Sequence, residues 1–400
     1  MDSLPHAASP HPAMTPSRKI LCALALASAA LLAVPGPAPA APQRLAHARL
    51  SQAGRELIFT LRTRSPVALS QLQPQPDARR AAARYLCLGL SRPEGSGELR
   101  LCLGGKHSQR RVGEVVVNAA GKPAKRSSVR ATVKRPSPTK LVVALVPGDA
   151  GLAPRRYGWR TIASRGCEPG GKCAEALPAK GGFAFRLRPV RAVGCTGGSA
   201  GLISNGPREA KVVALTFDDG PSEYTAGFLQ VLREKGVHGT FFEIGQEMAG
   251  REATMRQILA EGNELGDHTM NHVEYPGYSQ IAGDAHLIED YTHFTPCLFR
   301  PPGGAVNSSV IATAGSLGMR TITWDVDPQD WSTPGTSAIY GNIVANAKPG
   351  SIILMHDGGG PRGETLEALP GIIDTLRSRG YGFATVSELL GYRLLYRPYG

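Results

Sequence analysis

The sequence lacks three features that mark common classes of protein. It has no cysteines in CxxC spacing, which structural zinc sites often use. Its basic residues are not interleaved with aromatic residues, which make up only 6% of the chain, so it does not resemble a base-stacking nucleic-acid binder. Its N-terminal apolar stretch, residues 20–34, is about 15 residues long, whereas a transmembrane helix needs roughly 20. We therefore expect no nucleic-acid partner and no integral membrane span after processing.

The N-terminus is instead typical of a secretory signal peptide. Arg18 and Lys19 precede the apolar stretch, and the small residues that follow it end at Ala41. We predict a signal peptide at residues 1–41 and a protein that is secreted, extracellular or associated with the cell wall. A membrane anchor is the alternative interpretation of this segment.

The cysteines agree with export. Six remain when Cys22 in the leader is set aside, an even number that suits an oxidising compartment. Short separations within a β-rich region favour two of the pairs, and the remaining two cysteines would join the linker to the second domain. The expected disulfides are Cys87–Cys102, Cys167–Cys173 and Cys195–Cys297.

Charge is distributed unevenly along the chain. Residues 42–200 contain 29 Lys and Arg and 8 Asp and Glu, a net charge of +21, whereas residues 201–400 contain 14 and 23, a net charge of −9. A strongly basic domain of an exported protein is suited to an anionic cell-wall polymer, an acidic polysaccharide or lipid headgroups. A solvated arginine-rich surface without a partner is the alternative.

The basic half is predicted to be a β-rich accessory domain. Over residues 42–193, short β-prone segments such as 56–63, 128–134 and 140–146 are separated by Gly, Pro and Ser. This spacing favours an all-β, sandwich-like domain. This domain contains no cluster of candidate catalytic residues. His107 is isolated, and a lone histidine is usually structural or solvated. A Gly-rich linker at residues 194–207 follows.

The second half is predicted to be an α/β domain over residues 208–392, with a C-terminal tail at 393–400. A buried strand at 212–217 is followed by an amphipathic helix at 225–235, and the alternation continues along the chain. Repeated βα units indicate a parallel barrel or a doubly wound sheet. In such folds the active groups gather at the C-terminal ends of the strands.

Five motifs in this half follow apolar, strand-like runs, and together they contain the groups of a metal-dependent hydrolase. Each is weak evidence alone, but the set is specific. The motifs are Thr216-Phe217-Asp218-Asp219-Gly220-Pro221, His268-Thr269-Met270-Asn271-His272, Arg300-Pro301-Pro302-Gly303-Gly304, Asp327-Pro328-Gln329-Asp330-Trp331 and Leu354-Met355-His356-Asp357.

The first two motifs predict a metal site. Adjacent aspartates in an extended strand point in different directions, so Asp218 and Asp219 can have different roles. We expect His268 and His272 to lie on the same side of a helical turn. Asp219 and the two imidazoles form a ligand set that suits Zn²⁺, with Co²⁺ or Ni²⁺ also possible. Zinc in such a site lowers the pKa of water to about 7, which provides a nucleophile at neutral pH.

The remaining motifs predict the acid–base groups. Asp218 is the candidate base, and Arg300 would keep it ionised and oriented. His356 is the candidate acid for the leaving amine, and Asp330 would fix its tautomer. A buried ion pair without a catalytic role is the alternative for Arg300 and Asp330.

Four further residues are predicted to contact the substrate. Trp331 and Leu354 would form the walls of a small apolar pocket that fits an acetyl methyl group, and Pro302 and Gly303 of the third motif complete the set.

The five motifs resemble those of the polysaccharide deacetylases of carbohydrate esterase family 4, the NodB-homology domain, over about residues 208–392. The resemblance implies a distorted (β/α)₇ barrel. It places Asp218 as base, His356 as acid and Arg300 and Asp330 as their partners. It also implies an oxyanion donor in the backbone N–H of Gly303. The third motif of the family often reads Arg-Pro-Pro-Tyr-Gly, so this chain has Gly303 in place of an aromatic residue that walls the groove.

These observations predict a secreted, zinc-dependent polysaccharide N-deacetylase that hydrolyses the N-acetyl groups of N-acetylglucosamine units, in peptidoglycan first and in chitin-like polymers second. An O-acetyl esterase that acts on acetylated glycan such as xylan is the closest alternative. A catalytically silent cell-wall-binding protein and a surface adhesin that depends on residues 43–193 are alternatives of another class.

Overall fold

The computed structural model describes residues 45–67, 72, 85–91, 97–103, 111–117, 123–164, 174–197 and 199–399. These residues belong to the compact unit formed by residues 43–400. The predicted signal peptide, the predicted Cys167–Cys173 disulfide and His107 lie outside the described residues.

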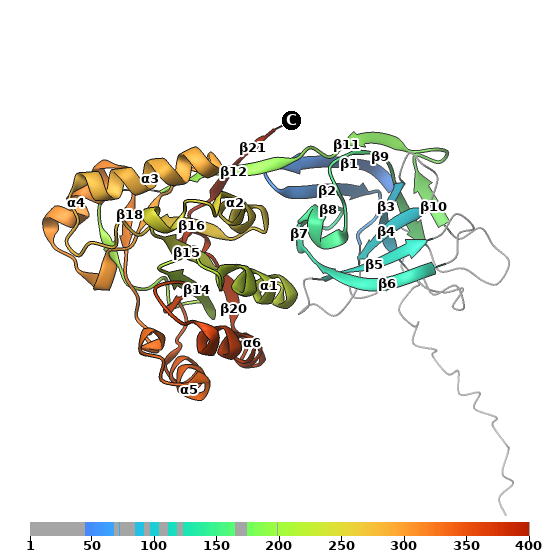
Figure 1. Cartoon of the computed structure of the whole chain (residues 1–400). Helices are drawn as coiled ribbons and strands as arrows, with labels where there is room; N and C mark the ends of the chain where they lie inside the picture. The colour runs from blue at the N-terminus through green and yellow to red at the C-terminus, as the bar shows by residue number, and fades with distance from the viewer. Residues whose placement is uncertain are drawn as a thin grey trace, which may run out of the picture. The chain divides into compact units, whose positions relative to one another are not determined.

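The first part of the described chain forms two antiparallel sheets (Figure 1). One sheet has the order β1-β2-β8-β7, and the other has the order β10-β9-β3-β4-β5-β6, with β11 paired to β9. The strands of the first sheet are β1 (Leu45–Ala53), β2 (Glu56–Thr63), β7 (Thr132–Ser137) and β8 (Lys140–Leu145). The strands of the second sheet are β3 (Leu86–Ser91), β4 (Glu98–Leu103), β5 (Arg111–Val117), β6 (Pro123–Arg130), β9 (Arg156–Ser164), β10 (Ala174–Leu177) and β11 (Phe183–Arg186).

The two sheets share one apolar core, as expected for a sandwich. Alternate residues of each strand point inward, and in β2 these are Leu57, Phe59 and Leu61. Phe59 packs edge-on against Trp159 of the second sheet, with 6.4 Å between ring centroids. The predicted all-β, sandwich-like class is therefore confirmed.

The predicted Cys87–Cys102 disulfide is also present, between residues that face each other across β3 and β4. The segment 128–134, predicted as one strand, belongs to two. The break falls at Ala131, where the chain leaves β6 in one sheet and enters β7 in the other.

The second part of the chain is built around a curled parallel sheet with the order β13-β18-β17-β16-β15-β14-β19, and β20 pairs with β14. An isolated parallel bridge joins Val326, four residues beyond β18, to Ile353 of β19 at the other end of this order. The strands are β13 (Leu202–Ile203), β14 (Val212–Asp218), β15 (Thr240–Glu243), β16 (Glu264–Asp267), β17 (Leu298–Phe299), β18 (Arg320–Ile322), β19 (Ile352–His356) and β20 (Gly382–Ala384). The predicted barrel of β/α units is confirmed.

Helices pack on the outside of this sheet (Figure 1). Their buried faces follow the spacing of amphipathic helices, as in α1, where Phe228, Leu229 and Leu232 are buried. The helices are α1 (Thr225–Lys235), α2 (Glu252–Ala260), α3 (Tyr278–Thr292), α4 (Ser308–Ser316), α5 (Thr336–Asn346), α6 (Gly363–Ser378) and α7 (Val386–Leu389). Among the described residues, no helix combines the length and the apolar character needed to cross a membrane.

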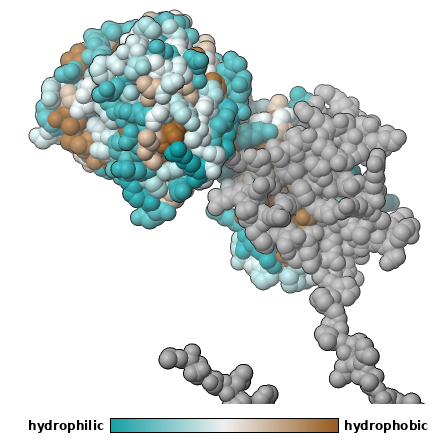
Figure 2. Space-filling view, turned by 90° about the horizontal axis from the view of Figure 1, so that it is seen from below, coloured by the Kyte–Doolittle hydropathy of each residue, from teal (hydrophilic) through white to brown (hydrophobic). Residues whose placement is uncertain are grey.

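The segment between the two parts is joined to the end of the chain. Strand β12 (Val190–Cys195) pairs antiparallel with β21 (Leu394–Pro398), so most of the segment 393–400, predicted to be a tail, forms a strand. Cys195 is bonded to Cys297 just before β17, which confirms the disulfide predicted between these two cysteines. Seen from below, much of the described surface is hydrophilic, with small apolar areas (Figure 2).

Candidate active site

Several of the predicted site residues come from the C-terminal ends of strands in the parallel sheet. Asp218 ends β14 and His356 ends β19, while His268 and Arg300 directly follow β16 and β17. Because parallel strands end at the same edge of a sheet, residues more than a hundred positions apart meet there.

Asp219, His268 and His272 lie together, and their candidate ligand atoms are all within 4.8 Å of one another. The Oδ1 atom of Asp219 is 3.3 Å from His268 Nε2 and 3.1 Å from His272 Nε2. This oxygen is buried and has no hydrogen-bond partner among the described residues. The three atoms therefore face a common point, as ligands of one ion do.

The hydrogen bond of His268 and the charges around Asp219 suit these residues to metal binding. His268 Nδ1 donates a hydrogen bond of 2.7 Å to the carbonyl of Arg300, which leaves Nε2 as the ligand atom. Burial alone would raise the pKa of Asp219, but the imidazoles of His268 and His272 outweigh it and lower this pKa. The residues present thus fit a divalent cation held by one carboxylate and two imidazoles.

Two details of the prediction for this triad were wrong. Residues 268–272 form a loop rather than a helical turn, with left-handed backbone at Thr269 (φ 71°) and His272 (φ 55°). Asp219 is also left-handed (φ 72°), so its side chain diverges from that of Asp218 through a local bend and not through strand alternation. Non-glycine residues rarely adopt this conformation, which persists where surrounding contacts over-determine it.

Asp218 is held by Arg300. Arg300 Nη1 donates to Asp218 Oδ1 at 2.7 Å and to Thr216 Oγ1 at 2.8 Å. The second carboxylate oxygen, Oδ2, lies 3.9 Å from His268 Nε2 and so faces the metal triad. One oxygen is fixed by the guanidinium, and the other remains available at the site.

Arg300 is fully buried, and burial lowers its pKa, although the charge of Asp218 acts in the opposite direction. Its guanidinium carbon lies 4.1 Å from the ring centroid of Phe242, a cation–π contact that compensates part of the desolvation. A buried arginine with one carboxylate partner holds that carboxylate in a fixed direction.

His356 and Asp330 form the second predicted pair. His356 Nδ1 donates to Asp330 Oδ1 at 2.7 Å, and the backbone N–H of His356 donates to Asp330 Oδ2 at 2.9 Å. Burial lowers the pKa of His356, but the hydrogen bond and charge of Asp330 outweigh burial and raise it. The Nε2 atom is then free to carry a proton for an external group.

The four residues predicted to contact the substrate differ in their exposure to solvent. Pro302 and Leu354 are buried, Trp331 is 55% exposed, and Gly303 is exposed with a left-handed φ of 61°. A side chain at Gly303 would approach the carboxylate of Glu274. None of the four residues lines the cavity of about 650 Å³ beside the triad. That cavity is lined by Asp219, His272 and residues from three loops, 222–224, 246–251 and 359–361.

The sequence comparisons agree with this geometry. The family model for polysaccharide deacetylase matches residues 205–322. A peptidoglycan-N-acetylglucosamine deacetylase of Bacillus cereus is 42% identical over 195 residues, which cover 47% of this chain and 92% of the relative. The chain belongs to the polysaccharide deacetylase family.

Two further relatives match the same half of this deacetylase. The peptidoglycan-N-acetylglucosamine deacetylase PgdA of Listeria monocytogenes is 35% identical over 191 residues, which cover 46% of this chain and 40% of the relative. A chitooligosaccharide deacetylase of Sinorhizobium fredii is 35% identical over 190 residues, which cover 43% of this chain and 88% of the relative.

Sequence reasoning missed several residues that bind the predicted site residues of the deacetylase or the backbone beside them. Arg362 is buried and donates to the carbonyls of Gly358 and Gly359, the segment that follows the fifth motif. Thr365 Oγ1 donates to Asp330 Oδ2 at 2.9 Å. Both residues lie at the start of α6 or just before it, outside the five motifs. No local pattern indicates them, because their partners are distant or are backbone atoms.

Buried carboxyl groups behind the metal triad were also missed. Asp284 of α3 accepts a hydrogen bond from the backbone N–H of His268 at 2.9 Å, and Asp267 accepts one from Thr269 N at 3.0 Å. Burial raises the pKa values of both carboxyl groups. They fix the backbone that carries His268. Spacing along the chain gives no sign of Asp284, which is 16 residues away.

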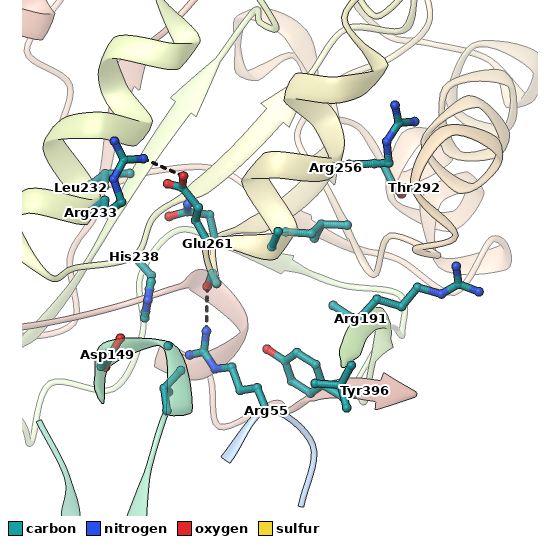
Figure 3. A pocket seen from close by; sticks show the side chains of 18 of the residues that line it. Arg55, Asp149, Arg191, Leu232, Arg233, His238, Arg256, Glu261, Thr292 and Tyr396 are labelled. Atoms are coloured by element: carbon teal, nitrogen blue, oxygen red, sulfur yellow. Dashed lines mark hydrogen bonds and ion pairs between the residues drawn. The ribbon is translucent and has the colours of Figure 1, made fainter. Parts of the chain in front are cut away.

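A second cavity of about 560 Å³ lies near the start of β15 and β16, at the opposite end of these strands from the triad (Figure 3). Three of its arginines contact residues at or near the C-terminal ends of helices. Arg233 pairs with Glu261 at 2.6 Å, Arg55 donates to the carbonyl of Gly262 at 3.3 Å, and Arg256 donates to the carbonyl of Tyr291 at 3.1 Å. Cations at helix C-termini are stabilising. This cavity contains none of the predicted site residues.

Proposed function

We propose that the protein is an exported, metal-dependent N-deacetylase that acts on the N-acetylglucosamine units of peptidoglycan. The observation that carries this proposal is the assembly of three parts at one edge of the sheet: the Asp219–His268–His272 triad, the Asp218–Arg300 pair and the His356–Asp330 pair.

The proposed roles follow from these contacts. Asp219, His268 and His272 would hold Zn²⁺, with Co²⁺ or Ni²⁺ as possible substitutes, and the ion would polarise the amide carbonyl. Asp218 would take the proton of the attacking water through Oδ2, while Arg300 holds Oδ1. His356 would protonate the leaving amine, with Asp330 fixing its orientation.

The relatives support the choice of substrate. Two of the three relatives above are named for peptidoglycan N-acetylglucosamine and one for chitooligosaccharide. Peptidoglycan is preferred because the relative with 42% identity, 92% of which is matched, acts on it. A chitin-like polymer is the second choice.

Several features of the chain support action outside the cell. These are the leader predicted at residues 1–41, the two disulfides and the net charge of +21 over residues 42–200. We further propose that residues 42–193 form an accessory domain that attaches the enzyme to an anionic wall polymer, and that 194–207 connect it to the catalytic domain at 208–392.

The test is the release of free amine from N-acetylglucosamine oligomers and from purified peptidoglycan by chelated protein, with and without added Zn²⁺. We expect zinc-dependent release that disappears in Asp218→Asn. Absence of release from both substrates in the presence of metal would contradict the proposal. Release of acetate from acetylated xylan instead would identify an O-acetyl esterase.

A further inference from the structure

The outer face of the sheet β1-β2-β8-β7 carries a cluster of basic side chains. The inner residues of these strands fill the core of the sandwich, so the alternate residues point outward. Outward residues include Arg49, Arg62 and Lys134, which are exposed, and Lys140, which is partly exposed. They come from four different strands, but the sheet brings them together.

Strand register places three basic residues side by side. His47 of β1 lies opposite Arg62 of β2, and Arg62 lies opposite Lys140 of β8. Adjacent strands are about 4.8 Å apart, so these side chains form one short row across the sheet.

The next row on the same face adds two more basic residues. Arg49 lies opposite Thr60, Thr60 opposite Val142, and Val142 opposite Lys134. This row is about 7 Å from the first, because residues on one face of a strand repeat every second position. We call His47, Arg49, Arg62, Lys134 and Lys140 the basic face.

The close spacing of these basic residues destabilises the sheet when no anion is bound to them. Like charges directly opposite each other on neighbouring strands are destabilising, as at Arg62 and Lys140. Within the strands of this sheet, the one carboxylate that points outward is Glu56, which lies opposite Ala53 at the far end of β1 and β2. No ion pair joins the basic face to another described residue. The face therefore has the chemistry of a site for an external anion.

We propose that the basic face binds a linear polymer of polyol phosphate units, as an attachment site for the cell wall; this rests on the proposed function. Successive cations along and across the strands match a chain of repeating phosphodiesters. A phosphate presents oxygens in several directions, so Arg62 and Lys140 on neighbouring strands can bind the same group, whereas a planar carboxylate pairs best with one guanidinium. The residues between the cations are Thr60 and Val142, which offer no aromatic ring for a nucleic-acid base.

The other sheet provides an internal comparison. Arg156 of β9 lies opposite Arg186 of β11, and both are exposed. This pair forms a single row across two strands. Together with Arg155 and Lys180, which lie nearby in the sequence, it carries as many positive charges as Arg49, Arg62, Lys134 and Lys140, but it does not form rows across four strands.

The experiment measures binding of poly(glycerol phosphate) to the full chain at rising salt concentrations. The test variant is Arg49→Gln/Arg62→Gln/Lys134→Gln/Lys140→Gln. The matched control, Arg155→Gln/Arg156→Gln/Lys180→Gln/Arg186→Gln, removes the same number of charges from the same half of the chain. We expect a loss of affinity of about tenfold or more in the test variant, a weaker dependence on salt, and a change within about threefold in the control.

A further variant, Arg49→Lys/Arg62→Lys, keeps the charge and is expected to retain most of the binding. It distinguishes an effect of charge from a loss of folding caused by substitution at these positions. Equal losses in the test and control variants would overturn the proposal in favour of a diffuse charge effect, as would wild-type affinity in the test variant. Binding of DNA as tight as that of the wall polymer would overturn the choice of partner. Turnover of soluble N-acetylglucosamine oligomers, measured on the same preparations, tests the proposed function separately, because the basic face contributes no residue to the metal triad.

Discussion

The two halves of the molecule differ in where they place their charged residues. In the described part of the β-sandwich, the buried polar residues are Thr63 and Thr161, neither of which is charged. The barrel half instead buries many carboxylates and two arginines, among them Asp218, Asp330 and Arg300. Burying a charge without a partner costs free energy. Buried charged groups are therefore often found at catalytic and binding sites, where they are paired.

The difference indicates two ways of using charge. The barrel half holds charges in fixed positions within a low-dielectric surrounding, where each contact can direct a reaction. In the described part of the sandwich half no charged side chain is fully buried, and the partner proposed for its positive charges would respond to their number and spacing. We therefore expect substitutions in the barrel site to change turnover, and substitutions in the sandwich to leave turnover of soluble substrates unchanged.

The largest effect is expected for the metal triad. His268→Ala should remove one ligand and reduce turnover on the order of 10³-fold, which corresponds to the several kcal/mol that a Lewis-acid ion supplies. The measurements are metal content by elemental analysis and amine release. His286→Ala, on the exposed face of α3, is the control. Full metal content together with wild-type turnover in His268→Ala would exclude this ligand.

The next effect tests the base. Asp218→Asn keeps the shape of the side chain but cannot take a proton, so kcat should fall roughly 10²- to 10⁴-fold while the metal content stays near that of the wild type. Asp290→Asn, at an exposed position of α3, is the matched control. If both variants turn over at the same rate, Asp218 is a structural partner of Arg300 and not the base.

A smaller effect is expected in the pH profile. Asp330 raises the pKa of His356 against the effect of burial, and the acid is active when protonated, so activity should fall as pH rises through this raised pKa. Asp330→Asn should therefore move the alkaline limb to lower pH. Thr365→Val removes one hydrogen bond to Asp330 but keeps its charge, and should move the limb less. If the alkaline limb of the pH profile is unchanged in Asp330→Asn, His356 is not the acid.

The smallest effect on turnover is expected in the sandwich. Cys87→Ser/Cys102→Ser removes a disulfide that closes a loop of 15 residues and should destabilise the sandwich by about 3 kcal/mol. The turnover of soluble oligomers at a temperature below the unfolding transition should stay unchanged. A parallel loss of turnover would show that the two halves do not act independently, which would break the comparison.

Local signals in the sequence predicted much of this architecture. The helix at 225–235 and the strand at 56–63 have the bounds that their patterns indicate, because each has a clear apolar period. The five motifs also identified the contacting pairs Asp218–Arg300 and His356–Asp330. These predictions succeeded where the residue types themselves limit the chemistry.

Other predictions needed information that no local pattern contains. The spacing of His268 and His272 suggested a helical turn, but the backbone is a loop fixed partly by Asp284 from α3. Arg362 was not predicted because it bonds to backbone carbonyls, which have no signature in the sequence. The basic face could not be predicted either, because its members are non-local and meet through strand register.

The sequence by itself determined the elements, the type of site and the division of charge between the two halves, since these depend on residue types and short-range periodicity. Only the tertiary structure decided which atoms meet. It turned Asp219 toward the two imidazoles through a left-handed bend, gave one oxygen of Asp218 to Arg300, and aligned basic residues from four strands on one face. Such geometry depends on contacts between segments that are far apart in the chain, where packing and hydrogen bonding override local preference.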